Sequence, residues 1–265
     1  MTTPLVLRSD ADGIATLTLN APETINALSE AMMDALSAQL DAIGNDGSVR
    51  VVILRGAGKH FCAGHNLKEM TSHREDSDGG AAYFHNLFKR CSRMMLQLTE
   101  LPQPVIAEVS GIATAAGCQL VASCDLAVAS SDARFATSGV NIGLFCATPM
   151  VALTRNVPAK QGLAMLLTGD FVSADHALSI GLINDVAEPD QLADTTMALA
   201  TTIASKSPVA IRIGKQAFYA QATLDRKQAY ELAARAMADN MMACDAQAGI
   251  QAVIDKQPMP PWEGK

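Results

Sequence analysis

Residues 109–121 read VSGIATAAGCQLV, and residues 56–70 read GAGKHFCAGHNLKEM. Each segment follows a short β-branched run, at residues 105–109 and 49–54, of the kind that forms a buried strand. Neither segment is a phosphate-binding loop, because GxxxxGK followed by Ser or Thr is absent from both, as is GxGxxG. Both supply backbone N–H groups in turns of small residues, the second at the start of a predicted helix. Such groups, aided by a helix dipole, can stabilise a carbonyl oxygen that gains negative charge.

The sequence around these segments alternates between strand and helix patterns, which is typical of an α/β protein. We expect strands at residues 4–20 (a hairpin), 49–54, 105–109, 126–129 and 134–137, and helices starting after Ser29 and spanning about 81–99. From residue 149 onward the pattern is almost wholly helical, with helix starts indicated at Pro158, Ser173, Pro189, Pro208 and Asp225. The chain therefore reads as one domain with a helical C-terminal part.

The composition excludes several classes of protein. The 265 residues carry 20 Lys and Arg against 27 Asp and Glu, a formal charge of −7, and 49% hydrophobic residues exclude intrinsic disorder. The acidic balance without a basic run argues against a nucleic-acid partner, and no apolar stretch approaches the roughly 18 residues needed to span a membrane. Six cysteines without a CxxC pair, and an N-terminus without secretory features, predict a reduced, cytoplasmic protein.

An ordered set of short motifs closely resembles the enoyl-CoA hydratase/isomerase (crotonase) superfamily across essentially the whole chain. The motifs are Pro22 with Asn26-Ala27-Leu28; Phe61 with Ala63-Gly64 and Leu67-Lys68-Glu69; Pro104 to Gly111; Cys124-Asp125-Leu126-Ala127; and Phe135, Gly143, Leu167-Thr168-Gly169 and Gly181-Leu182. The resemblance implies a spiral of ββα units over residues 1–200 and a helical trimerisation region over 201–265. It also implies a homotrimer or hexamer that acts on acyl-CoA thioesters without a cofactor, because coenzyme A is part of the substrate.

The resemblance also assigns site residues. Two backbone N–H groups that hold the thioester oxygen fall on His65 and Ala116, where Ala115 and Ala116 replace two glycines of the family's Gly-Gly-Gly run. Alanine can serve there because the donor is the backbone, provided that its φ and ψ are allowed. The residues expected to line the substrate site are Thr24, Ile25, Ala27, Ala63, Gly64, His65, Asn66, Leu67, Ala116, Gln119, Gly139 and Gly143.

The chain departs from the family pattern at the two acid/base positions. Hydratases of the family place glutamates where this chain has Gln119 and Gly139. Glutamine exchanges no proton at neutral pH and glycine has no side chain, whereas each positioned acid or base contributes about 10²–10⁴-fold. Efficient hydration is therefore not expected, although glutamate restored at both positions is expected to raise it. The segment around these replacements is similar to the enoyl-CoA hydratase domain-containing protein 3 branch of the superfamily.

Three residue-level questions stay open in the sequence. The His65 side chain either titrates beside the thioester or leaves all the work to its N–H. The missing side chain at Gly139 predicts a void, which bicarbonate (as in naphthoyl-CoA synthases) or a carboxylate of the substrate can fill. Lys68 and Arg74 either neutralise a coenzyme A phosphate or are ordinary surface charges.

Two further groupings read as structural. Cys118 and Cys146 flank the expected pocket but have no His–Asp partner at a telling spacing, which favours small core thiols. His60, Cys62 and His65 lack a fourth ligand, so we expect no metal site.

The first hypothesis is an acyl-CoA-binding enzyme with an intact oxyanion hole and a reaction other than efficient hydration. The alternatives are a non-catalytic acyl-CoA-binding or assembly protein, and a slow hydratase or a decarboxylase or isomerase that uses a substitute group.

Overall fold

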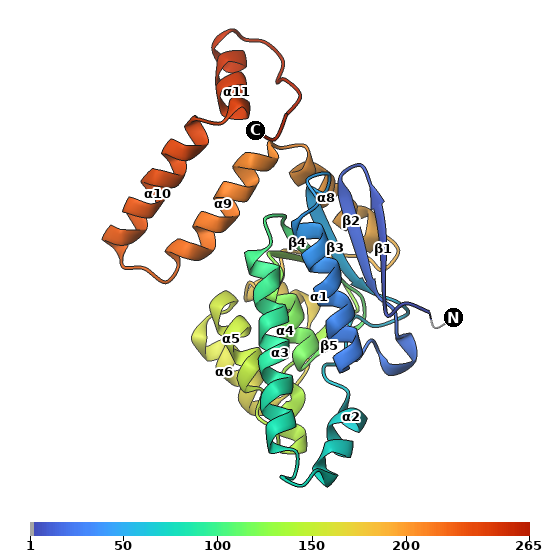
Figure 1. The fold of residues 1–265 in the computed structure, drawn as a ribbon. Helices are drawn as coiled ribbons and strands as arrows, with labels where there is room; N and C mark the ends of the chain where they lie inside the picture. Colours follow the sequence, from blue (N-terminus) through green and yellow to red (C-terminus); the bar gives the residue numbers. More distant parts are fainter. Residues whose placement is uncertain (1–2) are drawn as a thin grey trace.

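The computed structural model describes residues 3–265 and is built around a six-stranded sheet with the strand order β1-β2-β3-β4-β6-β9 (Figure 1). Its strands are β1 (Val6–Ala11), β2 (Ile14–Leu19), β3 (Val51–Gly56), β4 (Val105–Val109), β6 (Leu126–Ser130) and β9 (Asp185–Ala187). β1 and β2 form the predicted antiparallel hairpin, and every other neighbouring pair is parallel. A second sheet contains β5 (Ile112–Thr114), β7 (Arg134–Ala136) and β8 (Val172–Ser173).

Two consecutive ββα units connect these sheets. In the first, β4 turns at Gly111 into β5, and β5 leads into α4 (Ala116–Ser123). Gly111 has a φ of +55°, and a Cβ there would overlap with the carbonyl oxygen of Lys59, so the turn requires glycine. The second unit runs through β6, β7 and the 3₁₀ helix η3 (Ser138–Ile142) into α5 (Ala147–Asn156). The predicted spiral of ββα units is confirmed.

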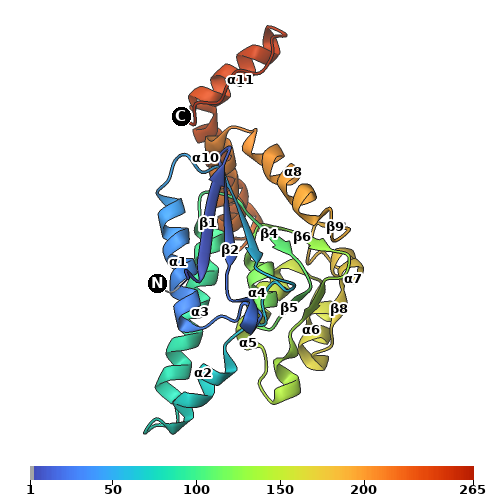
Figure 2. The ribbon, with the colours of Figure 1, turned by 90° about the vertical axis from the view of Figure 1, so that its right-hand side faces the viewer.

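The sheet is covered on both faces, and Figure 2 shows α1 (Glu30–Gly44) and α3 (Ala81–Glu100) on one side with α8 (Leu192–Ala204) on the other. Alternate strand residues serve the two cores: Val52 and Leu54 pack towards α1, whereas Val51 and Ile53 pack with the apolar face of α8. Such double-sided burial explains why β3 reads as a continuous apolar run.

The remaining helices complete the chain. They are η1 (Pro22–Thr24), α2 (Leu67–Ser72), η2 (His73–Glu75), α6 (Ala159–Thr168), α7 (Ala174–Ser179), α9 (Pro208–Gln221), α10 (Arg226–Met241) and α11 (Cys244–Ile254). None of the helices within residues 3–265 is both long and apolar enough to cross a membrane.

The three C-terminal helices α9, α10 and α11 extend to one side of the body in Figure 1, and Figure 2 shows α11 beyond one end of it. α10 has no buried residue, and Met237 and Met242 on or beside it are largely exposed. The predicted division at residue 200 lies inside α8, which packs on the sheet; the part that leaves the body begins at α9.

A buried charge cluster ties this extension to the body. Lys215 of α9 donates through Nζ to the carbonyl oxygens of Leu98 (2.8 Å) and Gln103 (2.9 Å) and to Oδ2 of Asp125 (2.7 Å). The hydroxyl of Tyr219, one turn along α9, donates to Oδ1 of Asp125 at 2.8 Å. Asp125 is therefore the acceptor that links α9 to the start of β6.

Candidate functional site

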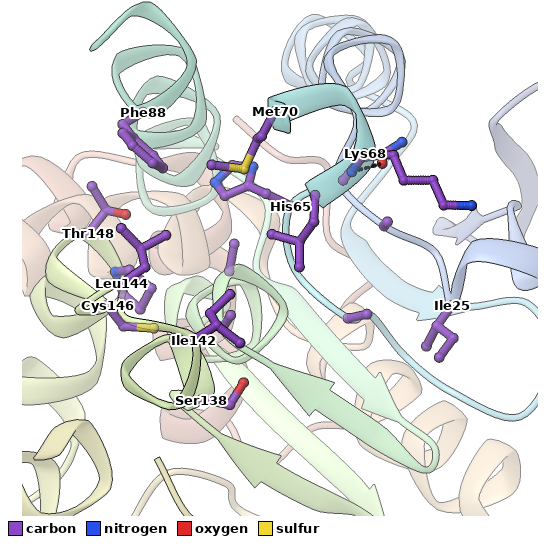
Figure 3. A pocket seen from close by; sticks show the side chains of 18 of the residues that line it. Ile25, His65, Lys68, Met70, Phe88, Ser138, Ile142, Leu144, Cys146 and Thr148 are labelled. Atoms are coloured by element: carbon purple, nitrogen blue, oxygen red, sulfur yellow. Dashed lines mark hydrogen bonds between the residues drawn. The ribbon is translucent and has the colours of Figure 1, made fainter. Parts of the chain in front are cut away.

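A cavity of about 620 Å³ lies where the two predicted donor segments meet. Its walls come from parts of residues 23–27, 63–70, 115–116 and 138–149, with Phe88 contributed by α3 (Figure 3). Segments distant in the sequence thus converge because the ββα units bring successive strand ends to one place.

Among the backbone N–H groups at this cavity, those of His65 and Ala116 donate to no acceptor within residues 3–265. Ala116 is the first residue of α4, so its N–H belongs to the unsatisfied first turn of a helix. Gly64 brings the two segments together, because a Cβ added there would lie 3.1 Å from the Ala116 nitrogen. Its φ of +90° is one that glycine adopts at little cost. The two N–H groups therefore belong to segments that meet at Gly64 in the cavity wall.

The backbone immediately before the second donor is strained. Ala115 has a φ of 51° and a ψ of −118°, a combination that favours glycine, and it precedes the first turn of α4 directly. Such a conformation costs a non-glycine residue about 1–3 kcal/mol. Alanine at residue 116 itself is helical, so the donor survives the loss of glycine, and the cost falls on its neighbour.

Replacing Ala115 by glycine is expected to raise the free energy of unfolding by about 1 kcal/mol, because strain relief exceeds the added freedom of the unfolded chain. Replacing Ala116 by glycine is expected to lower it by about 0.5–1 kcal/mol, because that residue is helical. Urea denaturation of the two neighbouring variants measures both. If the two variants changed the free energy of unfolding in the same direction, strain at residue 115 would be contradicted.

Most residues expected at the substrate site line this cavity. Those that line it are Thr24, Ile25, Ala27, Ala63, His65, Asn66, Leu67, Ala116 and Gly139. Three do not: Gly64 supports the wall through its turn, Gln119 is buried in α4, and Gly143 ends η3 with a φ of +79°.

Sequence reasoning missed the apolar half of the wall. Met70, Phe88, Leu144 and Phe145 line the cavity, and they come from α2, α3 and the loop before α5. Phe88 adjoins buried Leu87 on α3, and neither its spacing nor its type distinguishes it from a core residue. Only the fold places it at the site.

The structure contradicts the predicted void at Gly139. A Cβ there would overlap with the carbonyl oxygen of Leu144 and lie 2.8 Å from Sγ of Cys146, so the chain itself fills the space. The direction in which a side chain would leave Gly139 is therefore closed by the chain, although Gly139 lines the cavity. Gln119, at the other replaced position, is 4% exposed, and its Oε1 has no partner within residues 3–265.

Restoring glutamate at both replaced positions is expected to fail, in contrast to the expectation from the sequence. Gly139→Glu overfills the space beside Leu144 and is expected to lower the free energy of unfolding by about 1–3 kcal/mol. The double variant Gln119→Glu/Gly139→Glu should therefore hydrate crotonyl-CoA no faster than the wild type. Gly47→Glu is the matched control, because an added Cβ there meets nothing within 4 Å. If the double variant were as stable as the wild type and hydrated crotonyl-CoA faster, the close packing of Leu144 and Cys146 against Gly139 would be contradicted.

The cysteines near the cavity and the grouping of His60, Cys62 and His65 lie in packed or hydrogen-bonded environments. Burial raises the pKa of Cys118 to about 12 and also raises that of Cys146, so neither thiol is a ready nucleophile. His60 accepts a hydrogen bond at Nδ1 from the N–H of Ile112 (3.2 Å), and burial raises the pKa of Cys62 to about 12. Within residues 3–265, no group of three His, Cys, Asp or Glu side chains is placed to hold a metal ion.

Comparisons with known proteins agree with this geometry. The family model described as enoyl-CoA hydratase/isomerase matches residues 9–265. The human protein named enoyl-CoA hydratase domain-containing protein 3, mitochondrial, is 46% identical over 253 residues, covering 95% of this chain and 81% of that protein. A solved structure of the same human protein has a TM-score of 0.91 at 42% identity, covering 97% of this chain and 99% of that one. A structure of an enoyl-CoA hydratase from Mycobacterium smegmatis has a TM-score of 0.94 at 50% identity, covering 98% and 99%.

One prediction from the sequence is wrong by these comparisons. The human, mouse and Xenopus laevis relatives are all named as mitochondrial, which points away from the predicted cytoplasmic location. The prediction rested on the lack of secretory features in the first ten residues, and import into mitochondria does not depend on those features. The fold and the branch inferred from the motifs agree with the same comparisons.

Proposed function

Because the chain belongs to the enoyl-CoA hydratase/isomerase family, we propose that it binds acyl-CoA thioesters and stabilises their enolates in the cavity. The observation that carries this proposal is the pair of unpaired N–H groups, His65 and Ala116, brought together by Gly64 at the cavity wall. Preorganised backbone donors of this kind stabilise the negative charge that develops on a thioester oxygen. The chemistry requires no cofactor, since coenzyme A arrives with the substrate.

The distribution of charge along the cavity orients the substrate. Figure 3 shows Lys68 and Ile25 at one end, and Phe88, Leu144 and Thr148 at the other. The Lys68 ammonium suits the phosphates of coenzyme A, and the apolar end suits an uncharged acyl group. We therefore assign the Lys68 end to coenzyme A and the Phe88 end to the acyl chain.

Efficient hydration is not part of the proposal. Adding water to an enoyl thioester needs one group that activates water and another that protonates carbon. Gln119 is buried and its amide neither gains nor loses a proton at neutral pH, and Gly139 has no room for a side chain. Reactions that require enolate formation and a single proton carrier fit the cavity better.

We also propose that the helical extension assembles three copies of the chain, alone or as a pair of trimers. The exposed apolar side chains of α10 and α11, including Met237, Val253 and Ile254, favour a covered surface. Sedimentation velocity of the purified protein tests this directly, since a monomer would contradict it.

Two measurements test the proposed function together. Calorimetric titration with octanoyl-CoA, succinyl-CoA and free coenzyme A should show the tightest binding for octanoyl-CoA, because the acyl end offers the succinyl carboxylate no cation. Incubation of octanoyl-CoA in deuterated buffer should place deuterium at the α-carbon. Binding without deuterium would support the rival function, a non-catalytic acyl-CoA-binding protein, and no binding would contradict both.

A further inference from the structure

We propose that the imidazole of His65, through Nε2, carries the proton in this cavity, in place of the two carboxylates that the chain lacks. The inference rests on the proposed function, because it names the proton carrier for the enolate chemistry at the same site. It goes beyond the backbone role of His65, whose N–H is one of the two oxygen donors.

The position of the ring follows from the donor geometry. The N–H and the side chain of His65 belong to one residue. An oxygen held by that N–H therefore places the α-carbon of the thioester, which is two bonds from the oxygen, near this residue. Figure 3 shows the ring beside Met70, on the side of the cavity towards Phe88 and away from Lys68. The ring therefore lies at the acyl end, where the α-carbon is expected.

Two contacts hold the ring in one orientation. Nδ1 lies 3.4 Å from the carbonyl oxygen of Leu28, and a carbonyl oxygen only accepts, so Nδ1 is the nitrogen that carries the proton. The ring meets Phe88 edge to face, with centroids 5.6 Å apart and an interplanar angle of 73°. The neutral tautomer thus leaves the lone pair of the ring on Nε2.

Nε2 is buried and has no partner among residues 3–265. A buried acceptor left without a partner costs about 1–3 kcal/mol. An unpartnered nitrogen in a residue that lines a cavity therefore indicates a role towards a ligand. Met70 lines the same cavity, and its unbranched side chain can shift to admit the acyl group. A substrate that displaces Met70 brings its α-carbon to the one ring nitrogen that is free to accept a proton.

The other ionisable side chains in the wall are poorly suited to the task. Among the cavity-lining residues of the described chain these are Glu23, Lys68 and Cys146. Lys68 lies at the opposite end, and Glu23 belongs to η1 beside Ile25 at that same end. Cys146 has a raised pKa because it is buried. His65 is the side chain with both the location and the chemistry.

Burial lowers the pKa of His65 from its ordinary value, and the hydrogen bond to Leu28 opposes this only in part. Burial therefore favours the neutral ring, which can act as a base. The titratable side chains on the elements packed around it are Lys68 and Glu69 on α2, Cys146 before α5, and Tyr83, His85, Lys89, Arg90, Cys91, Arg93 and Glu100 on α3. Glu69 is engaged with the N–H of Glu30 at 3.1 Å, and no charge–charge contribution enters the shift of His65.

The proton transfer balances with one base. Nε2 takes a proton from the α-carbon, the C–H electron pair forms the enolate whose oxygen is held by His65 and Ala116, and the ring becomes imidazolium. The imidazolium exchanges its N–H with solvent and then returns a proton to the α-carbon, which labels it, or to the γ-carbon of a 3-enoyl thioester, which shifts the double bond. Neither reaction consumes water or needs a second acid.

The test compares the wild type with His65→Gln in deuterated buffer containing octanoyl-CoA. His65→Gln keeps the backbone N–H and removes the base, so exchange at the α-carbon is expected to fall about 10²–10⁴-fold while the affinity for octanoyl-CoA changes little. The wild-type rate should rise with pH through a pKa below 6.5 and then level off, and the residual rate of the variant should lack that step. His85→Gln, on the exposed side of α3, is the matched control.

A second variant guards against misfolding. His65→Asn retains an N–H that can donate to Leu28, and it should lose exchange to the same extent as His65→Gln. If a folded His65 variant exchanged the α-carbon proton at the wild-type rate, the role of His65 would be overturned and the proposed function would stand. Bound thioester without exchange in the wild type would overturn the proposed enolate chemistry itself.

Discussion

Replacing Gly64 by alanine is expected to lower the rate of α-carbon deuterium exchange by about 10²–10³-fold, the usual cost of losing one oxyanion donor. The added methyl would lie 3.1 Å from the Ala116 nitrogen and 3.0 Å from Cβ of Ala115, and so would cover the second N–H. The φ of +90° adds strain that pushes the His65 segment away from α4. Mass spectrometry of octanoyl-CoA from deuterated buffer measures the rate.

Gly79→Ala is the matched control for this experiment. Gly79 also has a positive φ, of +67°, but an added Cβ there meets nothing within 4 Å. Both variants carry the backbone cost of alanine, and only Gly64→Ala obstructs a donor. Exchange at the wild-type rate in a folded Gly64→Ala protein would show that the Ala116 N–H does not hold the thioester oxygen.

Replacing Lys215 by methionine is expected to lower the free energy of unfolding by about 3–5 kcal/mol, because it leaves a buried carboxylate without its cation. The side chains of Lys215 and Asp125 are 6% and 13% exposed and 2.7 Å apart, so water cannot replace the lost partner. Two backbone carbonyls, those of Leu98 and Gln103, lose their donor as well. Guanidinium denaturation of the full chain measures the loss.

Lys160→Met, on the exposed face of α6, is expected to change stability by less than about 0.5 kcal/mol. The double variant Lys215→Met/Asp125→Asn removes the orphaned charge and should recover part of the loss. Equal stability of the Lys215 and Lys160 variants would show that α9 is held to the body by its apolar contacts alone.

Much of the fold was predictable because its signals are local. Ser29, Ser173 and Asp225 were each identified as the start of a helix, and each caps one by accepting a hydrogen bond from a backbone N–H. The helix expected from Pro189 starts at Leu192 instead, because a turn after β9, in which the N–H of Gln191 donates to the carbonyl oxygen of Glu188, occupies residues 188–191. A strand of three residues is too short to show an alternating pattern.

The site was predictable only where residues adjoin a motif. His65 and Ala116 belong to the two glycine-bearing segments, and the cavity contains both. Phe88 and Met70 reach the cavity from helices whose sequence gives no sign of it. The error at Gly139 has a different origin: the carbonyl oxygen of Leu144 fills the space, and backbone atoms from a neighbouring turn leave no trace in the sequence.

The central claim is that His65 and Ala116 hold the oxygen of an acyl-CoA thioester, and a crystal structure of the protein with octanoyl-CoA tests it most directly. The account predicts a thioester oxygen within about 2.7–3.2 Å of both amide nitrogens, with the acyl chain against Phe88 and Leu144 and the coenzyme A towards Lys68. A thioester bound with its oxygen facing away from both nitrogens would contradict it.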